Sequence, residues 1–456
     1  MNPIAQSLNQ VIEKGNPYLM EMLSDVGKNL FFPKGISYLM EMLSDVGKNL
    51  FFPKGILSQS AEAKEKAHKL NATIGIATEK GRTMIFPSVM DSICGIRPAA
   101  SLTYAPSFGI PALRKIWLDS LFIKNPSLSG KSVSLPVVTC GITHAISTFA
   151  DVWLDPNDVV VLPDMMWGNY NMALNVKKGA VIRHYPMFSE NGGLNLEAFE
   201  ETIKAEAKKR DKISVLLNFP NNPTGYTATV EEGERIVEIL TSVADEGTNV
   251  IAVMDDAYFG LFYEDQTLKE SLFANLCDRH PRLLGVKLDG ATKENFVWGL
   301  RVGFITYGCV IDGDEKGVYD ALERKTAGSI RGAISNASHL GQTIVLKSMQ
   351  DDNYTAEKEE KFEILKNRAI RVKEVLSDSR FTDAWDVYPF NSGYFMCIRL
   401  KSVNAETLRV HLLEKYGVGL ISIGEKDLRV AFSCLEENEI SELFNIVLQG
   451  VEDLKN

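Results

Sequence analysis

Residues 213–225 read ISVLLNFPNNPTG, and residues 249–258 read NVIAVMDDAY. Each stretch begins as a continuous apolar, largely β-branched run and ends in polar and turn-forming residues, which is typical of a parallel strand buried on both faces. Five similar runs alternate with segments of helical periodicity, at residues 134–140, 158–164, 180–186, 282–290 and 302–308. This alternation predicts an α/β fold with a mostly parallel seven-stranded sheet between helices, and with ligands at the carboxyl ends of the strands.

The sequence pattern changes after about residue 350 and predicts a second, smaller α+β domain. Its expected elements are two helices and two strands, at residues 357–376, 392–400, 427–434 and 437–454. We expect an N-terminal arm over residues 1–56, a small domain built from residues 57–97 and 350–456, and a large domain over residues 98–349. Two further helices are expected at residues 60–70 and 110–122.

The N-terminal arm contains a perfect duplication. Residues 18–36 recur letter for letter as residues 38–56, an offset of 20 positions. Repeat folds diverge and continue over several units, whereas this is one identical pair. We interpret it as a recent tandem duplication or a sequence-assembly artefact, with a lengthened interaction arm as the alternative.

Composition and charge exclude several classes of protein. The 456 residues include 49 basic and 59 acidic side chains, a net charge of −10, which opposes non-specific binding to nucleic acid or an anionic membrane. The six cysteines form no CxxC pair and the six histidines show no ligand spacing, so no disulfide framework and no metal site are predicted. The first residues lack a signal-peptide layout, and no run of 18 apolar residues occurs. We therefore expect a cytoplasmic protein with neither nucleic acid nor a membrane as partner.

Three short motifs follow predicted strands: NPTG at residues 222–225, D-x-A-Y at residues 255–258, and Lys293 placed eight positions before the arginine of R-x-G at residues 301–303. In this order they resemble the fold-type I pyridoxal-phosphate (PLP) aminotransferases of class I. Among these, the motifs are most similar to the aspartate and aromatic aminotransferases, over residue 57 to the C-terminus. The resemblance implies PLP as cofactor and the fold of that family.

The resemblance assigns catalytic roles to three residues. Lys293 corresponds to the Schiff-base lysine, a role that suits an amine able to condense with the cofactor aldehyde and then move the substrate Cα proton. Asp255 would face the pyridine nitrogen, and Tyr258 together with Asn222 would donate to the ring oxygen. Taken alone, Asp255 reads as a turn or cap residue and Asn222 as part of an Asn-Pro turn.

The cofactor phosphate needs several donors. Gly141, Ile142 and Thr143 begin a predicted helix directly after a strand, so free N–H groups point at an anion there. The resemblance adds Arg301 as a fixed cation, Thr292 beside the lysine, and Trp167 in PDMMWGNY as the residue that stacks on the ring. The alternative for Trp167 is a core or rim tryptophan.

Substrate recognition is expected from arginine, whose planar fork pairs bidentately with a carboxylate. The resemblance gives Arg429 to the substrate α-carboxylate, with Gly75 and Phe395 nearby; the alternative for Arg429 is an arginine on a strand edge. It also implies a homodimer with shared active sites, in which Arg331 meets a distal carboxylate across the interface. By the same match Tyr104 and Ser335 serve the neighbouring subunit's cofactor phosphate.

The expected function is transfer of an amino group from an L-amino acid, acidic or aromatic first, to a 2-oxo acid. A PLP-dependent lyase or decarboxylase on the same fold is the first alternative, since the same lysine serves those reactions. A non-catalytic PLP-fold amine sensor is the second, although the N-terminal arm offers no DNA-binding domain.

Overall fold

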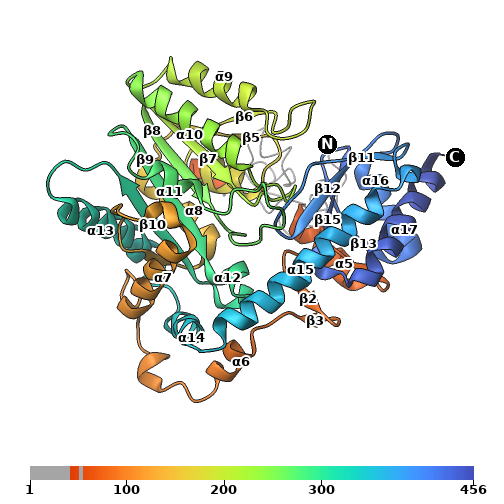
Figure 1. The fold of residues 1–456 in the computed structure, drawn as a ribbon, viewed down its shortest axis with the longest axis horizontal. Helices are drawn as coiled ribbons and strands as arrows, with labels where there is room; N and C mark the ends of the chain where they lie inside the picture. Colours follow the sequence, from red (N-terminus) through yellow and green to blue (C-terminus); the bar gives the residue numbers. More distant parts are fainter. Residues whose placement is uncertain (1–41, 51–54, 456) are drawn as a thin grey trace.

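The computed structural model describes residues 42–50 and 55–455, and its larger part is built around a seven-stranded sheet (Figure 1). The strand order is β4-β10-β9-β8-β7-β5-β6, and only β10 runs antiparallel to its neighbours. In that order the bounds are Val137–Thr139, Gly303–Cys309, Leu283–Gly290, Asn249–Asp255, Lys212–Asn218, Val159–Pro163 and Val181–Tyr185. The structure thus confirms the expected α/β fold, and all seven predicted strands are in the sheet.

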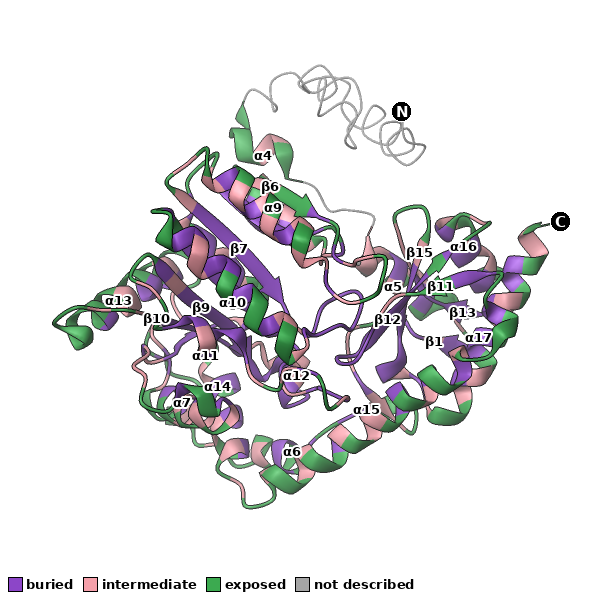
Figure 2. Cartoon of the chain, turned by 45° about the horizontal axis from the view of Figure 1, so that its top comes forward, coloured by how far each residue is buried: buried purple, intermediate pink, exposed green. Residues whose placement is uncertain are grey.

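Helices cover this sheet in two groups. One group comprises α9, α10 and α11, which contact one another in series and pack on β5 to β10; the other centres on α8, which contacts η4 and α13. Figure 2 shows the result, with the strands buried and the outer faces of the helices exposed. The bounds are α7 Pro111–Lys124, α8 Gly141–Trp153, η4 Asn171–Val176, α9 Leu196–Ala207, α10 Val230–Asp245, α11 Leu272–Leu276, α12 Ala291–Glu294, α13 Glu315–Ala333 and α14 His339–Met349.

Local sequence fixes where several helices begin and end. Thr229 and Glu232 form a reciprocal capping box at the start of α10, where each side chain accepts from the other residue's backbone N–H. Helix α16 (Ala405–Tyr416) ends at Gly417, which has a φ of +65° that glycine adopts without strain. Short turns of 3₁₀ helix connect other elements: η2 Pro98–Ala100, η3 Pro126–Leu128, η5 Trp298–Leu300, η6 Ser379–Phe381 and η7 Phe432–Cys434.

The smaller part contains a four-stranded antiparallel sheet in the order β11-β12-β15-β14. A parallel pair, β1 with β13, ties the N-terminal side of the chain to it, and β2 pairs with β3 in a hairpin. The strands are β1 Leu70–Asn71, β2 Thr78–Glu79, β3 Arg82–Thr83, β11 Trp385–Val387, β12 Phe395–Leu400, β13 Val418–Gly419, β14 Ile421–Ile423 and β15 Asp427–Ala431. The remaining helices of the described chain are α4 Asp45–Asn49, α5 Ile56–Lys66, α6 Pro87–Ile93, α15 Tyr354–Leu376, α16 Ala405–Tyr416 and α17 Glu437–Lys455.

Helix α15 links the two parts. Its N-terminal half lies beside α12, where Lys358 Nζ donates to Glu294 Oε1 at 2.5 Å, and its C-terminal half packs on α17. Helix α6 contacts α14 of the larger part, whereas α5 packs on β13 and β14. The division into three regions stays a prediction, and residues 18–36 of the duplication lie outside the described residues. Within residues 42–50 and 55–455, no helix is long and apolar enough to cross a membrane.

Candidate active site

A pocket lies at the carboxyl ends of β7, β8 and β9. Strand register places Asn218 of β7 beside Asp255 of β8, and Asp255 beside Leu288 of β9, so the polar residues that follow these strands meet at one edge. The lining residues are Ile142, Thr143, Trp167, Tyr170, Asn218, Asn222, Asp255, Ala257, Tyr258, Thr292, Lys293 and Arg301. The pocket therefore brings together nine of the residues that the sequence predicted, from six separate segments.

Lys293 and Asp255 are the two ionisable groups whose properties suit catalysis. Burial lowers the pKa of Lys293 to about 8, with Arg301 adding to the effect and Asp255 opposing it. The lysine Nζ lies 4.9 Å from the centroid of the Tyr258 ring. Burial raises the pKa of Asp255 to about 6, while hydrogen bonds from Tyr170 and Ala257 act in the opposite direction. An amine with a depressed pKa and a buried carboxylate thus share one pocket.

The neighbouring Asp256 has a different environment. Its Oδ2 binds Lys287 Nζ and accepts from Ser271 Oγ at 2.6 Å, and both partners are buried away from the pocket lining. Because successive side chains along a strand point to opposite sides, Asp255 faces the pocket and Asp256 belongs to an internal ion pair.

The part of the pocket next to the start of α8 has the features of an anion site. Helix α8 begins at Gly141 with no side-chain cap, so its first backbone N–H groups are available. Gly141 has a φ of +75°, and a Cβ placed there would lie 2.5 Å from Nη2 of Arg301. The Arg301 guanidinium is thus packed against the N-terminus of α8. Thr292 Oγ1 is buried here and has no hydrogen-bond partner in the described chain.

Arg429 from β15 reaches the same region from the smaller part. It is 1% exposed, its Nη1 donates to Asn222 Oδ1 at 3.0 Å, and its Nη2 donates to Thr73 O at 2.7 Å. Its guanidinium lies over the Phe395 ring, 4.2 Å from the centroid. A Cβ at Gly75 would lie 3.5 Å from Phe395 Cζ.

Arg429 is notable because it carries no counter-ion. No carboxylate of the described chain forms an ion pair with it, and its buried Nε has no partner. Burial of an unpaired charge costs several kcal/mol, so the arrangement favours an anionic ligand. The contact with Asn222 Oδ1 also orients that amide, because the acceptor end faces Arg429 and the NH₂ group is left to donate toward the pocket.

Seven predicted residues do not line the pocket of a single chain. Four of them adjoin residues that do, namely Gly75, Gly141, Phe395 and Arg429, and the other three are Tyr104, Arg331 and Ser335. Tyr104 is 88% exposed, and Arg331 is exposed with its Nη1 donating to Ser335 Oγ at 3.1 Å. They nevertheless share one surface, because Ser107 Oγ donates to Ser335 O at 2.8 Å. Their assigned role toward a partner subunit stays a prediction.

Three lining residues were not predicted from the sequence: Tyr170, Asn218 and Ala257. Tyr170 Oη donates to Asp255 Oδ2 at 2.5 Å, and Asn218 Nδ2 donates to the carbonyl of Asp255 at 2.9 Å. The available signal for Asn218 was its position at the end of a predicted strand. Tyr170 follows Trp167 by three positions, one turn later on the same face, and that spacing was the signal for it.

The residues present fit PLP. The uncapped helix terminus with Arg301 and the unpartnered Thr292 hydroxyl suits a phosphate, Asp255 suits a pyridinium nitrogen, and Lys293 suits an aldehyde. In the part of the chain that the structure describes, no group of three or more histidine, cysteine or acidic side chains is placed to hold a metal ion.

Comparisons with known proteins agree with this geometry. An aspartate aminotransferase of Geobacillus stearothermophilus is 26% identical over 249 residues, which cover 53% of this chain and 58% of that protein. The chain spans 58–59% of the length of the first curated relatives that it matches.

Solved structures share the fold over nearly the whole chain. An aminotransferase of Anaerococcus prevotii has a TM-score of 0.79 at 23% identity and covers 90% of this chain and 99% of its own. An α-aminoadipate aminotransferase of Thermus thermophilus, solved with N-(5′-phosphopyridoxyl)-L-leucine, has a TM-score of 0.71 at 20% identity and covers 91% and 99%. The model of the family "Aminotransferase class I and II" matches residues 69–447. Since this match takes in both sheets and every lining residue of the pocket, the chain belongs to the class I and II aminotransferase family.

Proposed function

We propose that this protein is a PLP-dependent aminotransferase that moves an amino group from an L-amino acid to a 2-oxo acid. The observation that carries the proposal is that Lys293, with its depressed pKa, and the buried Asp255 line one pocket. Family membership and the phosphopyridoxyl compound bound by the Thermus thermophilus relative support PLP as the cofactor.

The cofactor, when bound, supplies a protonated ring that withdraws electrons from the substrate Cα. The protein's own residues do the rest. Lys293 holds the cofactor by its amine and, once free, takes the proton from the substrate Cα, because a pKa near 8 leaves a useful fraction of base at neutral pH. Asp255 holds the ring nitrogen protonated, while Asn222 and Tyr258 donate hydrogen bonds to the ring oxygen. Burial raises the pKa of Tyr258, which keeps that hydroxyl a donor.

Substrate recognition is proposed to rest on two arginines. Arg429 binds the α-carboxylate, which supplies the counter-ion that this buried guanidinium lacks. Arg331 binds a distal carboxylate, and Trp167 lies beside the reacting centre, so acidic and aromatic amino acids are the proposed donors. Gly75 leaves room for the substrate next to Phe395.

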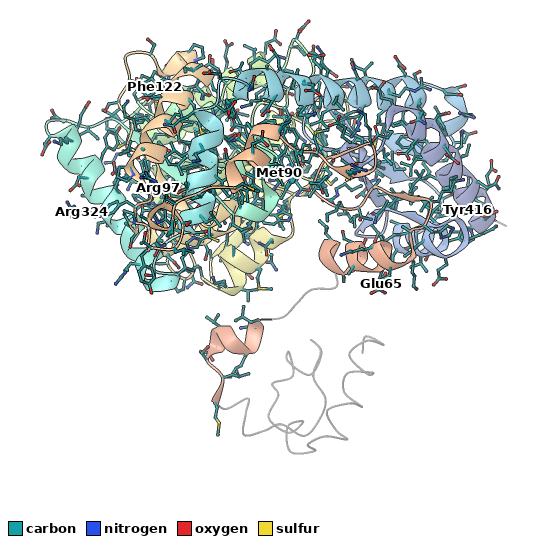
Figure 3. All side chains as sticks on the ribbon, turned by 90° about the horizontal axis from the view of Figure 1, so that it is seen from below. Glu65, Met90, Arg97, Phe122, Arg324 and Tyr416 are labelled. Carbon is teal, nitrogen blue, oxygen red and sulfur yellow. The ribbon has the colours of Figure 1, made fainter. Side chains whose placement is uncertain are left out.

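Arg331 can act on a substrate only if a second copy of the chain presents it, and we propose a homodimer with shared sites. Leu102 is 82% and Tyr104 88% exposed, unusually high for apolar side chains in an ordered loop. His339 Nδ1 lies 2.9 Å from Thr103 O, so this loop adjoins the segment that carries Arg331. Further exposed apolar residues continue the surface: Ile85, Met90, Ile93, Ile334 and Leu340. Figure 3 looks onto α6 in this region, with Met90 and Arg97 labelled.

The six cysteines are all free thiols, with no disulfide among them. This supports the cytoplasm as the proposed compartment, because thiols persist in a reducing environment. The net charge of −10 supports small molecules rather than nucleic acid or membranes as partners.

The proposal is tested by loading the apoprotein with PLP, reducing with borohydride and mapping the modified peptide by mass spectrometry. We expect the label on Lys293, and a Lys293→Ala variant that takes up no label. The loaded enzyme is then offered amino donors and 2-oxo acids, while the cofactor absorbance is recorded. We expect reversible amino transfer from aspartate, glutamate or an aromatic amino acid. A label on another lysine, or release of carbon dioxide or ammonia without amino transfer, would contradict the proposal.

A further inference from the structure

Tyr170 is a buried phenol in direct contact with the carboxylate proposed to bind the cofactor ring. Its side chain is 1% exposed, and its ring packs edge-on against Trp167 at a centroid distance of 5.6 Å. Its hydroxyl lies 2.5 Å from Asp255 Oδ2, although 85 positions separate the two residues in sequence. The backbone N–H of Tyr170 bonds to Trp167 O at 3.0 Å, which fixes the start of the helical turn that carries it.

The direction of this hydrogen bond is settled by chemistry. Burial and the charge of Asp255 raise the pKa of Tyr170 well above its usual value, so the phenol keeps its proton and donates. The other oxygen, Asp255 Oδ1, accepts from the backbone N–H of Ala257 at 3.1 Å. Each carboxylate oxygen therefore has one protein donor, and this arrangement resists rotation of the group.

Asp255 needs this support because it has no cation bound to it. No ion pair joins it to a basic side chain in the described chain, and it is 2% exposed. Burial without a counter-ion favours the neutral acid, whereas hydrogen bonds donated to the carboxylate favour the ionised form. A neutral Asp255 would be a poor acceptor for a pyridinium N–H.

We propose that Tyr170 is a positioning residue that holds Asp255 ionised and in one orientation, so that Asp255 can accept the ring N–H of bound PLP. This rests on the proposed function, since it requires the ring nitrogen to face Asp255. It also assigns a role to a residue for which no motif of the sequence provides one. Tyr170 acts through Asp255 and needs no contact with the cofactor itself.

The test measures cofactor affinity of the apoprotein, by quenching of protein fluorescence, with two ligands. One is PLP, and the other is its 1-deaza analogue, in which the ring nitrogen is replaced by C–H. Tyr170→Phe keeps the ring that packs on Trp167 and removes only the hydroxyl. We expect this variant to bind PLP about tenfold to a hundredfold more weakly, the range for a hydrogen bond to a charged group, and to bind the deaza analogue as the unmodified protein does. A purely structural role would weaken both ligands equally.

Two further variants separate the possible outcomes. Tyr307→Phe is the control: it removes a buried hydroxyl on β10 of the seven-stranded sheet, which is hydrogen bonded to Thr326 Oγ1 at 2.7 Å. This variant should leave the preference for PLP over the analogue unchanged. Asp255→Asn should abolish that preference, and adding Tyr170→Phe to it should have no further selective effect. Equal losses of affinity for both ligands in Tyr170→Phe, with the preference for PLP still abolished in Asp255→Asn, would overturn the role of Tyr170 alone. A full preference for PLP in Asp255→Asn would overturn the assignment of Asp255, and with it the proposed site.

Discussion

Replacing Arg429 by methionine should separate substrate binding from stability. Arg429 is 1% exposed, and the variant removes two hydrogen bonds, to Asn222 Oδ1 and Thr73 O. Each is worth about 1.5–3 kcal/mol because the donor is charged. The same change also removes a buried guanidinium without a counter-ion, whose burial costs several kcal/mol. These effects oppose each other, and we expect the free energy of unfolding of the apoprotein to change by less than about 2 kcal/mol.

Activity should respond much more strongly. Loss of the arginine leaves the substrate α-carboxylate without its bidentate partner, at a cost of about 2–5 kcal/mol, so kcat/KM should fall roughly 30- to 4,000-fold. The assay is the absorbance change of the cofactor during the half-reaction with phenylalanine, compared with phenethylamine, which lacks only the carboxylate. The unmodified enzyme should prefer the amino acid, and Arg429→Met should lose that preference.

Arg409→Met is the matched control. Arg409 is also nearly buried, at 2% exposure, but it pairs with Glu406 and Glu62 and lines no part of the pocket. This variant should unfold more easily than Arg429→Met while keeping the preference for phenylalanine over phenethylamine. The alternative of an arginine on a strand edge is wrong, because β15 pairs with β12 and β14 and Arg429 is buried. If Arg429→Met retained the full preference for the amino acid, Arg429 would have a structural role only and the carboxylate would bind elsewhere.

Three other predictions concern the lysine, the shared site and the arm. The neutral amine of Lys293 is the nucleophile and its pKa is about 8, so the rate of PLP attachment to the apoprotein should rise with pH and level off above about pH 8. Stopped-flow absorbance measures this rate, and a rate still rising at pH 10 would contradict the depressed pKa. Arg331→Ala should cost about 2–5 kcal/mol in kcat/KM for aspartate and glutamate and much less for phenylalanine; equal losses for all three, or a fully active monomer by sedimentation, would refute the shared site. Deleting residues 37–56 should leave soluble yield, dimer formation and kinetics nearly unchanged, because the preceding copy repeats the sequence that joins the first helix.

Sequence patterns predicted the seven-stranded sheet well because its four central strands, β7 to β10, are largely apolar runs of seven or eight residues. They predicted the part after residue 350 less completely: β11, α16, β13 and β14 were missed. The buried positions of α16 (405, 408, 409, 412 and 413) do form one face, but Arg409 stands on that face and weakens its apolar pattern. Two- and three-residue strands such as β13 and β14 carry too few positions for a period of two to be visible.

Site residues were predictable where a motif carries them along the chain. Asp255 and Lys293 follow strands within recognisable motifs, and both line the pocket. Lys287 shows the opposite case, because a lysine inside an apolar strand reads as an interruption of the pattern. It is fully buried, and its partners Asp256 and Asp289 come together only when β8 and β9 pair. Such contacts depend on tertiary structure and leave no local signal.

The substrate side of the site illustrates how distant segments come to act as one unit. Residues 72–76 are hydrogen bonded to β15 and the turn after it: Ala431 N donates to Ala72 O at 2.9 Å, and Ser433 Oγ donates to Ile76 O at 2.6 Å. Between these two contacts, Arg429 Nη2 donates a hydrogen bond to Thr73 O at 2.7 Å. The segment that contains Gly75 is therefore fastened to the strand that carries Arg429. Any displacement of that strand moves both, so the residues proposed to bind the carboxylate and to cover the substrate keep their relative position.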